Sequence, residues 1–289
     1  MKRDATLRET LRDAACQLSA AGIDESVREA RLLMSLALET DLGGLLRRAP
    51  DEVLTGPEAT RFSSVLTRRR AREPLAFIAG EAGFWTLTLS VTPDTLIPRA
   101  DSETLIEALC DARPGRAAVR SILDLGTGTG CLLLAALHEF PFAQGVGVDL
   151  SPGAAALARR NAERNALDGR AVFLAGSWDT ALAGRFDVIL SNPPYIPHAD
   201  LRALMPEVVA YEPARALDGG DDGLDAYRAL AALLPARLNP GGVAVLEIGI
   251  GQDTEVCALA TAAGLTVREV RTDLGGIARA VVLEGVTRG

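Results

Sequence analysis

From about residue 117 onward, short apolar runs alternate with turns and helical patterns, and this alternation restricts the fold more than any other feature. Ser121–Leu125 is a typical buried strand, a glycine-rich turn follows at residues 126–130, and Cys131–Phe140 is a helical stretch. Gly145–Asp149 is the next strand. This alternation predicts an α/β fold, in which ligands bind in the crevice at the carboxyl ends of the strands.

The glycine-rich turn and the strand after it predict a cofactor site. Gly126, Gly128 and Gly130 let the backbone approach a ligand at the amino end of a helix. The pattern is not the dinucleotide fingerprint, because its third glycine would fall at Cys131. Asp149 follows at about the 20-residue spacing of a carboxylate that accepts hydrogen bonds from ribose hydroxyls. Alternatively, Asp149 caps the helix that opens at Ser151.

Residues 187–195 read Asp-Val-Ile-Leu-Ser-Asn-Pro-Pro-Tyr, a short strand that ends in a stiff turn. Pro193 pushes Asn192 into an extended conformation. A primary amide or amine would donate one N–H to the side-chain oxygen of Asn192 and the other to the carbonyl of Pro193, with Tyr195 just beyond. That geometry would position a poorly nucleophilic nitrogen. The alternative is an ordinary exit from a strand into a loop.

Composition restricts the class of protein and its compartment. The 289 residues are 48% hydrophobic with a net charge of −8, so a sizeable core is expected and a nucleic-acid partner is disfavoured. Four scattered cysteines indicate free thiols in the cytoplasm, and with only two histidines we expect no metal site. We also expect no signal peptide and no membrane-spanning segment.

Residues 1–80 are predicted to form a small helical domain for substrate recognition. Apolar residues recur at helical spacing near residues 7–18, 24–38 and 57–72, with Val27 on the buried face of the second run. The third run ends in Arg68, Arg69, Arg70 and Arg72. These arginines either complement the carboxyl end of the helix dipole or contact an acidic partner surface.

Residues 81–100 are predicted to form a β-hairpin linker before the catalytic domain, residues 101–289. Phe84–Val91 alternates as one strand, Pro93 and Asp94 form the turn, and residues 96–99 return. A helix is expected from Ser102 to Ala112. Near its start, Arg99 and Glu103 either belong to a capped helix terminus or reach the active site.

The remaining elements complete the α/β domain. Helices are expected at residues 152–166, 225–237 and 254–263, and strands at 171–175, 242–248, 266–270 and 279–283. Trp178 either stacks on an adenine ring or packs in the core. His198 either lines the site or is solvated. The long polar loop from Tyr211 to Leu224 is either functional or disordered.

The chain resembles the peptide chain release factor glutamine N(5)-methyltransferases, which are class I S-adenosylmethionine enzymes. The resemblance covers nearly the whole chain, including Ile97-Pro98-Arg99, Asn192-Pro193-Pro194-Tyr195, Tyr211-Glu212-Pro213 and Glu247-Ile248-Gly249. Asn-Pro-Pro-Tyr alone is shared with adenine-N6 DNA methyltransferases, so it indicates the reaction type. The flanking segments and the helical domain indicate the substrate.

The resemblance implies a Rossmann-like methyltransferase fold, with a seven-stranded sheet, mostly parallel, helices on both faces and a small N-terminal helical domain. It implies S-adenosylmethionine as cofactor, bound by Gly126, Thr127, Gly128, Thr129, Gly130, Asp149, Trp178 and Asn192. It further implies that Asn192, Pro193, Pro194 and Tyr195 bind the glutamine, and that Asn192, Pro193 and Tyr195 are catalytic. The implied reaction is methylation of the amide nitrogen in the Gly-Gly-Gln motif of peptide chain release factors by a monomeric cytoplasmic enzyme.

The chain departs from the family pattern in three places. Ser102 replaces a usual threonine, Ser177 replaces an aspartate common before Trp178, and residues 273–279 are a looser version of the family's ending. Three alternative functions remain: a glutamine methyltransferase of a ribosomal protein, an adenine-N6 nucleic-acid methyltransferase, and a cofactor-binding regulator without enzymatic activity.

Overall fold

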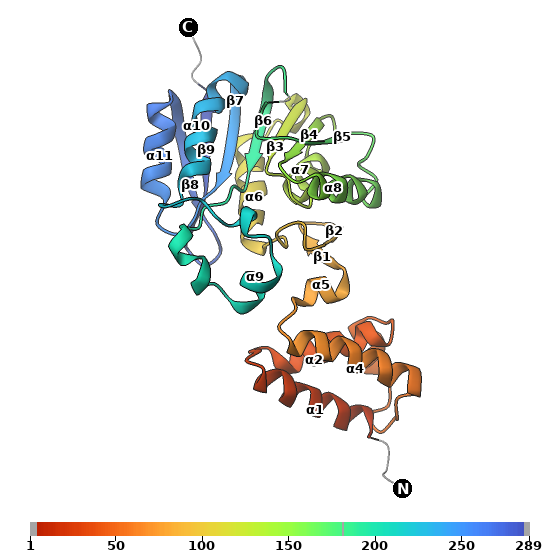
Figure 1. Cartoon of the computed structure of the whole chain (residues 1–289). Coiled ribbons are helices and arrows are strands. Elements are labelled where there is room, and N and C mark those ends of the chain that lie inside the picture. Colours follow the sequence, from red (N-terminus) through yellow and green to blue (C-terminus); the bar gives the residue numbers. More distant parts are fainter. Residues whose placement is uncertain (1–4, 181, 286–289) are drawn as a thin grey trace. The chain divides into compact units, whose positions relative to one another are not determined.

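The computed structural model describes residues 5–180 and 182–285 (Figure 1). Within these residues the chain forms two compact units. The smaller unit contains the chain up to Gly80 together with Pro206–Tyr211, and the larger contains Glu81–Met205 and the chain from Glu212 onward. The chain therefore leaves the larger unit after Met205 and returns to it at Glu212.

The smaller unit is helical. Its elements are α1 (Leu7–Ala20), α2 (Ser26–Ala37), α3 (Leu42–Arg47), α4 (Gly56–Arg70), α5 (Leu75–Ala79) and α9 (Pro206–Tyr211). Leu18, Leu33 and Met34 are fully buried in its core. The three predicted helical runs are confirmed, whereas α3 and α5 are too short for periodicity to predict them. The predicted burial of Val27 is wrong: this residue lies in the first turn of α2 and is 57% exposed, whereas the buried residues of α2 begin at Ala30.

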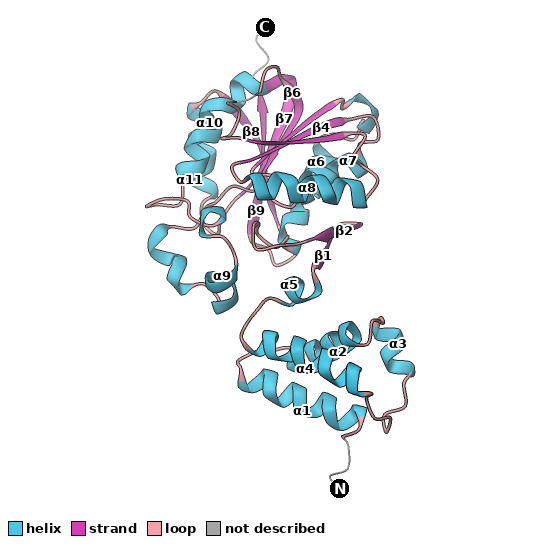
Figure 2. Ribbon diagram, turned by 45° about the vertical axis from the view of Figure 1, so that its right-hand side comes forward, coloured by secondary structure: helices cyan, strands magenta, loops and turns pink. Residues whose placement is uncertain are grey.

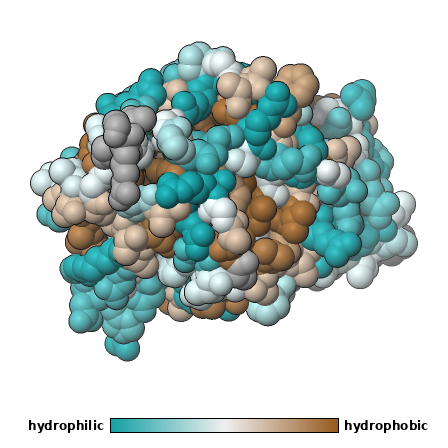
Figure 3. Space-filling model, turned by 90° about the horizontal axis from the view of Figure 1, so that it is seen from above, coloured by the Kyte–Doolittle hydropathy of each residue, from teal (hydrophilic) through white to brown (hydrophobic). Residues whose placement is uncertain are grey.

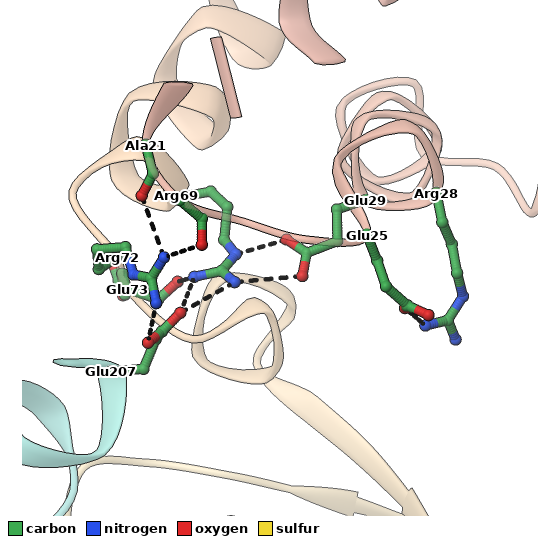
Figure 4. Close-up of polar contacts among 9 residues, drawn as sticks. Ala21, Glu25, Arg28, Glu29, Arg69, Arg72, Glu73 and Glu207 are labelled. Carbon is green, nitrogen blue, oxygen red and sulfur yellow. Dashed lines mark hydrogen bonds and ion pairs between the residues drawn. The ribbon is translucent and has the colours of Figure 1, made fainter. Parts of the chain in front are cut away.

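Buried ion pairs tie α4 to α2 and α9 (Figure 4). Arg69 is 6% exposed and donates to Glu29 at 2.5 Å and to Glu207 at 3.2 Å. Arg72 donates to Glu207 at 2.7 Å. Arg68, whose side chain is 42% exposed, pairs with Glu73 just after the end of α4. These three arginines have acidic partners in the same chain, so their pairing does not require the alternative of an acidic partner surface.

The larger unit contains a seven-stranded sheet in the order β5-β4-β3-β6-β7-β9-β8, seen in magenta in Figure 2. The strands are β3 (Ser121–Leu125), β4 (Gln144–Asp149), β5 (Ala171–Ala175), β6 (Phe186–Ser191), β7 (Leu238–Glu247), β8 (Leu265–Thr272) and β9 (Ala278–Gly285). Strands β3 to β7 pair in parallel, and β9 is antiparallel to both of its neighbours. The predicted methyltransferase sheet is confirmed.

Helices cover both faces of the sheet. They are α6 (Glu103–Ala112), α7 (Cys131–Glu139), α8 (Pro152–Arg164), α10 (Asp225–Arg237) and α11 (Asp253–Ala262). Residues of α6 and α7 pack in one core cluster, with Leu109 and Leu133 fully buried. Residues of α10 and α11 pack in the other, around Tyr227 and Leu230. Two separate cores thus hold the sheet between helical layers.

The predicted hairpin has a different register. Its strands are β1 (Glu81–Phe84) and β2 (Leu87–Ser90), so the turn is at Trp85 and Thr86. The predicted turn at Pro93 and returning strand at residues 96–99 are wrong. Alternation from Phe84 to Val91 suggested one strand, but Phe84 pairs with Leu87 and both are buried in the same core. Trp85 takes a positive φ of 55°, which such a tight turn requires.

Exposed apolar residues are scattered over the larger unit. Phe142, Leu150, Val172 and Ile250 are each more than half exposed, and the face in Figure 3 shows hydrophobic residues in small patches among hydrophilic ones. Such exposure is ordinary for a folded protein. None of the helices in the described ranges is long and apolar enough to cross a membrane. The same residues include no cluster of three or more His, Cys, Asp or Glu side chains that could hold a metal ion.

Replacing Glu207 with glutamine should destabilise the smaller unit, because Arg69 and Arg72 would each lose an ionised acceptor. We expect the free energy of unfolding to fall by about 1–3 kcal/mol in a urea titration. The matched control is Glu25→Gln, since Glu25 pairs with Arg28 where both side chains are more than 60% exposed. That change should cost less than about 0.5 kcal/mol. Equal effects of the two substitutions would contradict the prediction.

Candidate active site

One pocket in the larger unit collects most of the predicted site residues. Its lining includes Gly126, Thr127, Gly128, Thr129, Asp149, Trp178, Asn192 and Pro194. These residues come from the turn after β3, the end of β4, the segment after β5 and the end of β6. Gly130, Pro193 and Tyr195 are not part of its wall. The pocket therefore lies at the carboxyl edge of the sheet, where α/β proteins bind ligands.

The glycines of the turn have two different roles. Gly126 and Gly128 line the pocket with φ values of +77° and +54°, a conformation that side chains rarely adopt. Gly130 is the residue before α7, and a Cβ there would lie 3.2 Å from Ala158 and 3.3 Å from Leu134. Gly130 thus allows close packing of α7 and α8, whereas the other two shape the pocket.

Asp149 holds the turn in place. Its carboxylate accepts from the Gly128 amide at 2.9 Å and from the Ser151 amide at 2.8 Å. The N-cap of α8 is Ser151, whose hydroxyl accepts from the Ala154 amide. The alternative that Asp149 caps this helix is therefore wrong. A carboxylate offers about four acceptor positions, so two remain for a ligand that brings a pair of hydroxyls.

A second carboxylate, not predicted as a site residue, lies behind the turn. Asp124 is 1% exposed and accepts from the Thr127 hydroxyl at 2.6 Å. Burial raises its pKa to about 7, although the hydrogen bond from Thr127 acts in the opposite direction. A charged residue inside an otherwise apolar strand was the available sequence signal.

Arg99 lines the pocket, and a residue far along the chain pairs with it there. Glu212, whose side chain is 1% exposed, pairs with Arg99 and accepts from the Ile97 amide at 3.0 Å. The Tyr-Glu-Pro segment thus fixes the Ile-Pro-Arg segment. Glu103 instead accepts from the Trp85 amide at 2.6 Å and supports the hairpin turn. Of the two candidates, Arg99 lies at the pocket and Glu103 does not.

The end of β6 is joined to β7 by polar contacts. Asn192 donates to the Ser102 hydroxyl at 3.2 Å, and Ser102 donates to Glu247, the last residue of β7. Tyr195 donates to the other oxygen of Glu247 at 3.2 Å. Burial raises the pKa of the Tyr195 hydroxyl, so it stays protonated. Ser102 and Glu247 were not predicted as site residues.

His198 lies in the loop after the motif. Its side chain is exposed and faces Asp218 at 2.8 Å. It does not line the pocket, so the solvated interpretation is the one that the structure supports.

The pocket suits a nucleoside that carries a diol. The glycine backbone leaves room for close approach, and Asp149 supplies acceptors. Thr95 lines the wall with a buried hydroxyl that has no hydrogen-bond partner among the described residues. Trp178, half-buried and at a positive φ of 47°, adds an aromatic face. The residues present therefore fit S-adenosylmethionine.

Comparisons with known proteins agree with this geometry. Residues 100–221 match the family model described as methyltransferase small domain, and residues 9–80 match the PrmC N-terminal domain. A T. thermophilus 16S rRNA methyltransferase structure in complex with AdoMet and guanosine is 25% identical, with a TM-score of 0.50. The match covers 72% of this chain and 50% of that one. Fold and pocket together define a class I methyltransferase that uses S-adenosylmethionine.

Sequence relatives narrow the class. The release factor glutamine methyltransferase of Rhodospirillum rubrum is 48% identical, over 93% of this chain and 82% of the relative. That of Cereibacter sphaeroides is 46% identical, over 94% of this chain and 96% of the relative. The chain belongs to the release factor glutamine methyltransferase family.

Asp149→Asn should weaken the binding of S-adenosylmethionine. The amide would lose the charge-assisted acceptor and would turn an NH₂ group toward a backbone donor, Gly128 or Ser151. We expect a loss of roughly 1.5–3 kcal/mol in calorimetric titration. The control is Ser151→Ala, which removes the cap of α8 and should lower stability by about 1 kcal/mol with cofactor affinity unchanged. Unaltered affinity in a folded Asp149→Asn variant would show that Asp149 does not hold the cofactor.

Proposed function

We propose that this chain transfers a methyl group from S-adenosylmethionine to the side-chain amide nitrogen of a glutamine in peptide chain release factors. The observation that carries the proposal is the pocket with Asn192 at the end of β6, in a chain 48% identical to a release factor glutamine methyltransferase. An amide nitrogen is a weak nucleophile because its lone pair is conjugated with the carbonyl. The enzyme's main task is therefore to orient that nitrogen.

In this proposal Asn192 and Pro193 perform the orientation. Asn192 lines the pocket, and its NH₂ group is engaged by Ser102. Its oxygen then accepts one N–H of the glutamine, and the Pro193 carbonyl accepts the other. These two hydrogen bonds strengthen as the nitrogen lone pair localises, which stabilises the transition state more than the bound substrate. The bound cofactor supplies the electrophilic methyl group.

Pro194 and Tyr195 complete the proposed glutamine site. Pro194 lies in the pocket wall. Tyr195 packs against the core beside α10, and its carbonyl accepts from Gln252 at 2.9 Å. Because both ends of Tyr195 are held, it limits how the turn after Asn192 moves. Once methylated, the amide nitrogen is acidic and releases its proton to water.

We propose further that the enzyme works as a monomer in the cytoplasm and does not act on nucleic acid. The net charge of −8 supports a protein substrate, since nucleic acid binding relies on a basic surface. The region after the motif is also acidic, with Asp218, Asp221, Asp222 and Asp225 close in sequence.

The decisive experiment incubates the protein and S-adenosylmethionine with a release factor, a ribosomal protein preparation or DNA. Mass spectrometry should find one methyl group on a single release factor glutamine. Methylation confined to DNA or to a ribosomal protein would support the corresponding alternative. Cofactor binding without methylation of any of them would support a regulator instead.

Asn192→Ala should abolish most turnover while sparing the cofactor. We expect kcat to fall by about 10²–10³-fold, the effect of losing one preorganised hydrogen bond to the reacting group. S-adenosylmethionine affinity should change far less. Asn165→Ala is the control, since the Asn165 side chain donates to the carbonyls of Thr88 and Asn161 and does not line the pocket. Methyl transfer by Asn192→Ala at the wild-type rate would disprove the assigned role.

A further inference from the structure

A buried hydrogen-bonded chain leads from Glu247 to Asn192. Glu247 and Ser102 are each 2% exposed. One carboxylate oxygen accepts from Ser102 and the other from Tyr195, while Ser102 itself accepts from the Asn192 NH₂ group. The four side chains come from the end of β7, the turn before α6, the end of β6 and the motif after it.

The direction of donation along this hydrogen-bonded chain follows from ordinary hydrogen-bond rules. An ionised carboxylate only accepts, and a serine hydroxyl has a single hydrogen to donate. Because Ser102 gives that hydrogen to Glu247, its oxygen only accepts from Asn192. Asn192 must therefore turn its NH₂ group toward Ser102. Its oxygen forms no hydrogen bond with any described residue, so it remains available to a ligand.

We propose that Glu247, acting through Ser102, is a positioning residue that makes the Asn192 amide present its oxygen, rather than its nitrogen, to the substrate. This inference rests on the proposed function, because only an N–H donor in the substrate requires an acceptor here. The two faces of an asparagine amide are nearly equal in shape, so packing alone would select between them poorly. The direction of the hydrogen-bonded chain makes the selection.

Burial and the groups around Glu247 determine the pH range over which Glu247 is ionised and the hydrogen bonds run from Asn192 through Ser102 to Glu247. Burial raises its pKa to about 7, while Ser102, Arg279 and Tyr195 act to lower it and Asp101 acts to raise it. Arg279 is itself shared with Asp273 at 3.3 Å and Asp101 at 3.4 Å. Cys131 of α7 also faces this region, and burial keeps its thiol neutral. Tyr227 donates to the Glu247 backbone carbonyl at 2.9 Å, not to the carboxylate.

Protonation of Glu247 would reverse the direction in which these side chains donate their hydrogen bonds. A neutral Glu247 can donate to Ser102, which then donates to the Asn192 oxygen. The NH₂ group would turn to the substrate and oppose its N–H. Turnover should therefore be highest above the pKa of Glu247 and should decline as the pH falls through about 7.

Ser102 variants provide the test, with the release factor as substrate. The wild type should show an acid limb in kcat near pH 7. Ser102→Ala should lower kcat/KM about 10–100-fold, as expected for loss of a charge-linked hydrogen bond, and should lose the acid limb. Ser102→Thr retains the hydroxyl, so it should keep the wild-type kcat/KM and the acid limb of the pH profile. Glu247→Gln removes the titrating group, so its residual rate should have no acid limb.

The matched control is Ser191→Ala. Ser191 is also buried and precedes Asn192, but its hydroxyl donates to the Leu125 carbonyl at 2.7 Å. The pH profile of kcat for Ser191→Ala should keep the acid limb. Calorimetric titration of S-adenosylmethionine checks that each variant is folded. A wild-type pH profile in Ser102→Ala, with normal methylation by the wild type, would overturn the inference and leave the proposed function standing. No methylation by the wild type would instead reject the proposed function.

Discussion

Parallel pairing of the central strands is the constraint on which the site depends. Leu125 of β3 pairs with Val148 of β4, and Ser191 of β6 pairs with Leu246 of β7. The next residues along these strands are Asp149, Asn192 and Glu247, so they arrive at one edge of the sheet. A shift of one residue in either pairing would turn these side chains to the opposite face. The polar site therefore requires the exact register of an apolar sheet.

Two buried charges in this protein are stabilised in different ways. Arg69 is surrounded by the carboxylates of Glu29 and Glu207, so it stays ionised and structural. Glu247 has hydroxyl partners, and the nearby Arg279 is shared with Asp273 and Asp101. Ion pairing keeps Arg69 charged, whereas burial raises the pKa of Glu247 to about 7 although its hydroxyl partners act to lower it.

Local sequence patterns predicted most regular elements well. Ser121–Leu125, Ala171–Ala175 and Asp225–Arg237 have the predicted bounds, because each has a clear period and an unambiguous end. The prediction of the hairpin was wrong because a two-residue turn at Trp85 and Thr86 does not interrupt the alternation of apolar and polar residues. The short helices α3 and α5 were not predicted because five or six residues carry too little periodicity. The sequence does not distinguish Gly130, which packs two helices, from Gly126 and Gly128, which line the pocket.

The sequence by itself determined the alternating strands and helices, the stiff turn after Asn192 and the family to which the chain belongs. These depend on local backbone preferences and on motifs of a few neighbouring residues. Tertiary structure alone decided the partners of the buried charges. Glu207 lies 138 positions from Arg69, and Glu247 lies 145 positions from Ser102. Such pairs depend on strand order and helix packing, since a hydrogen bond requires proximity in space and places no condition on separation along the chain.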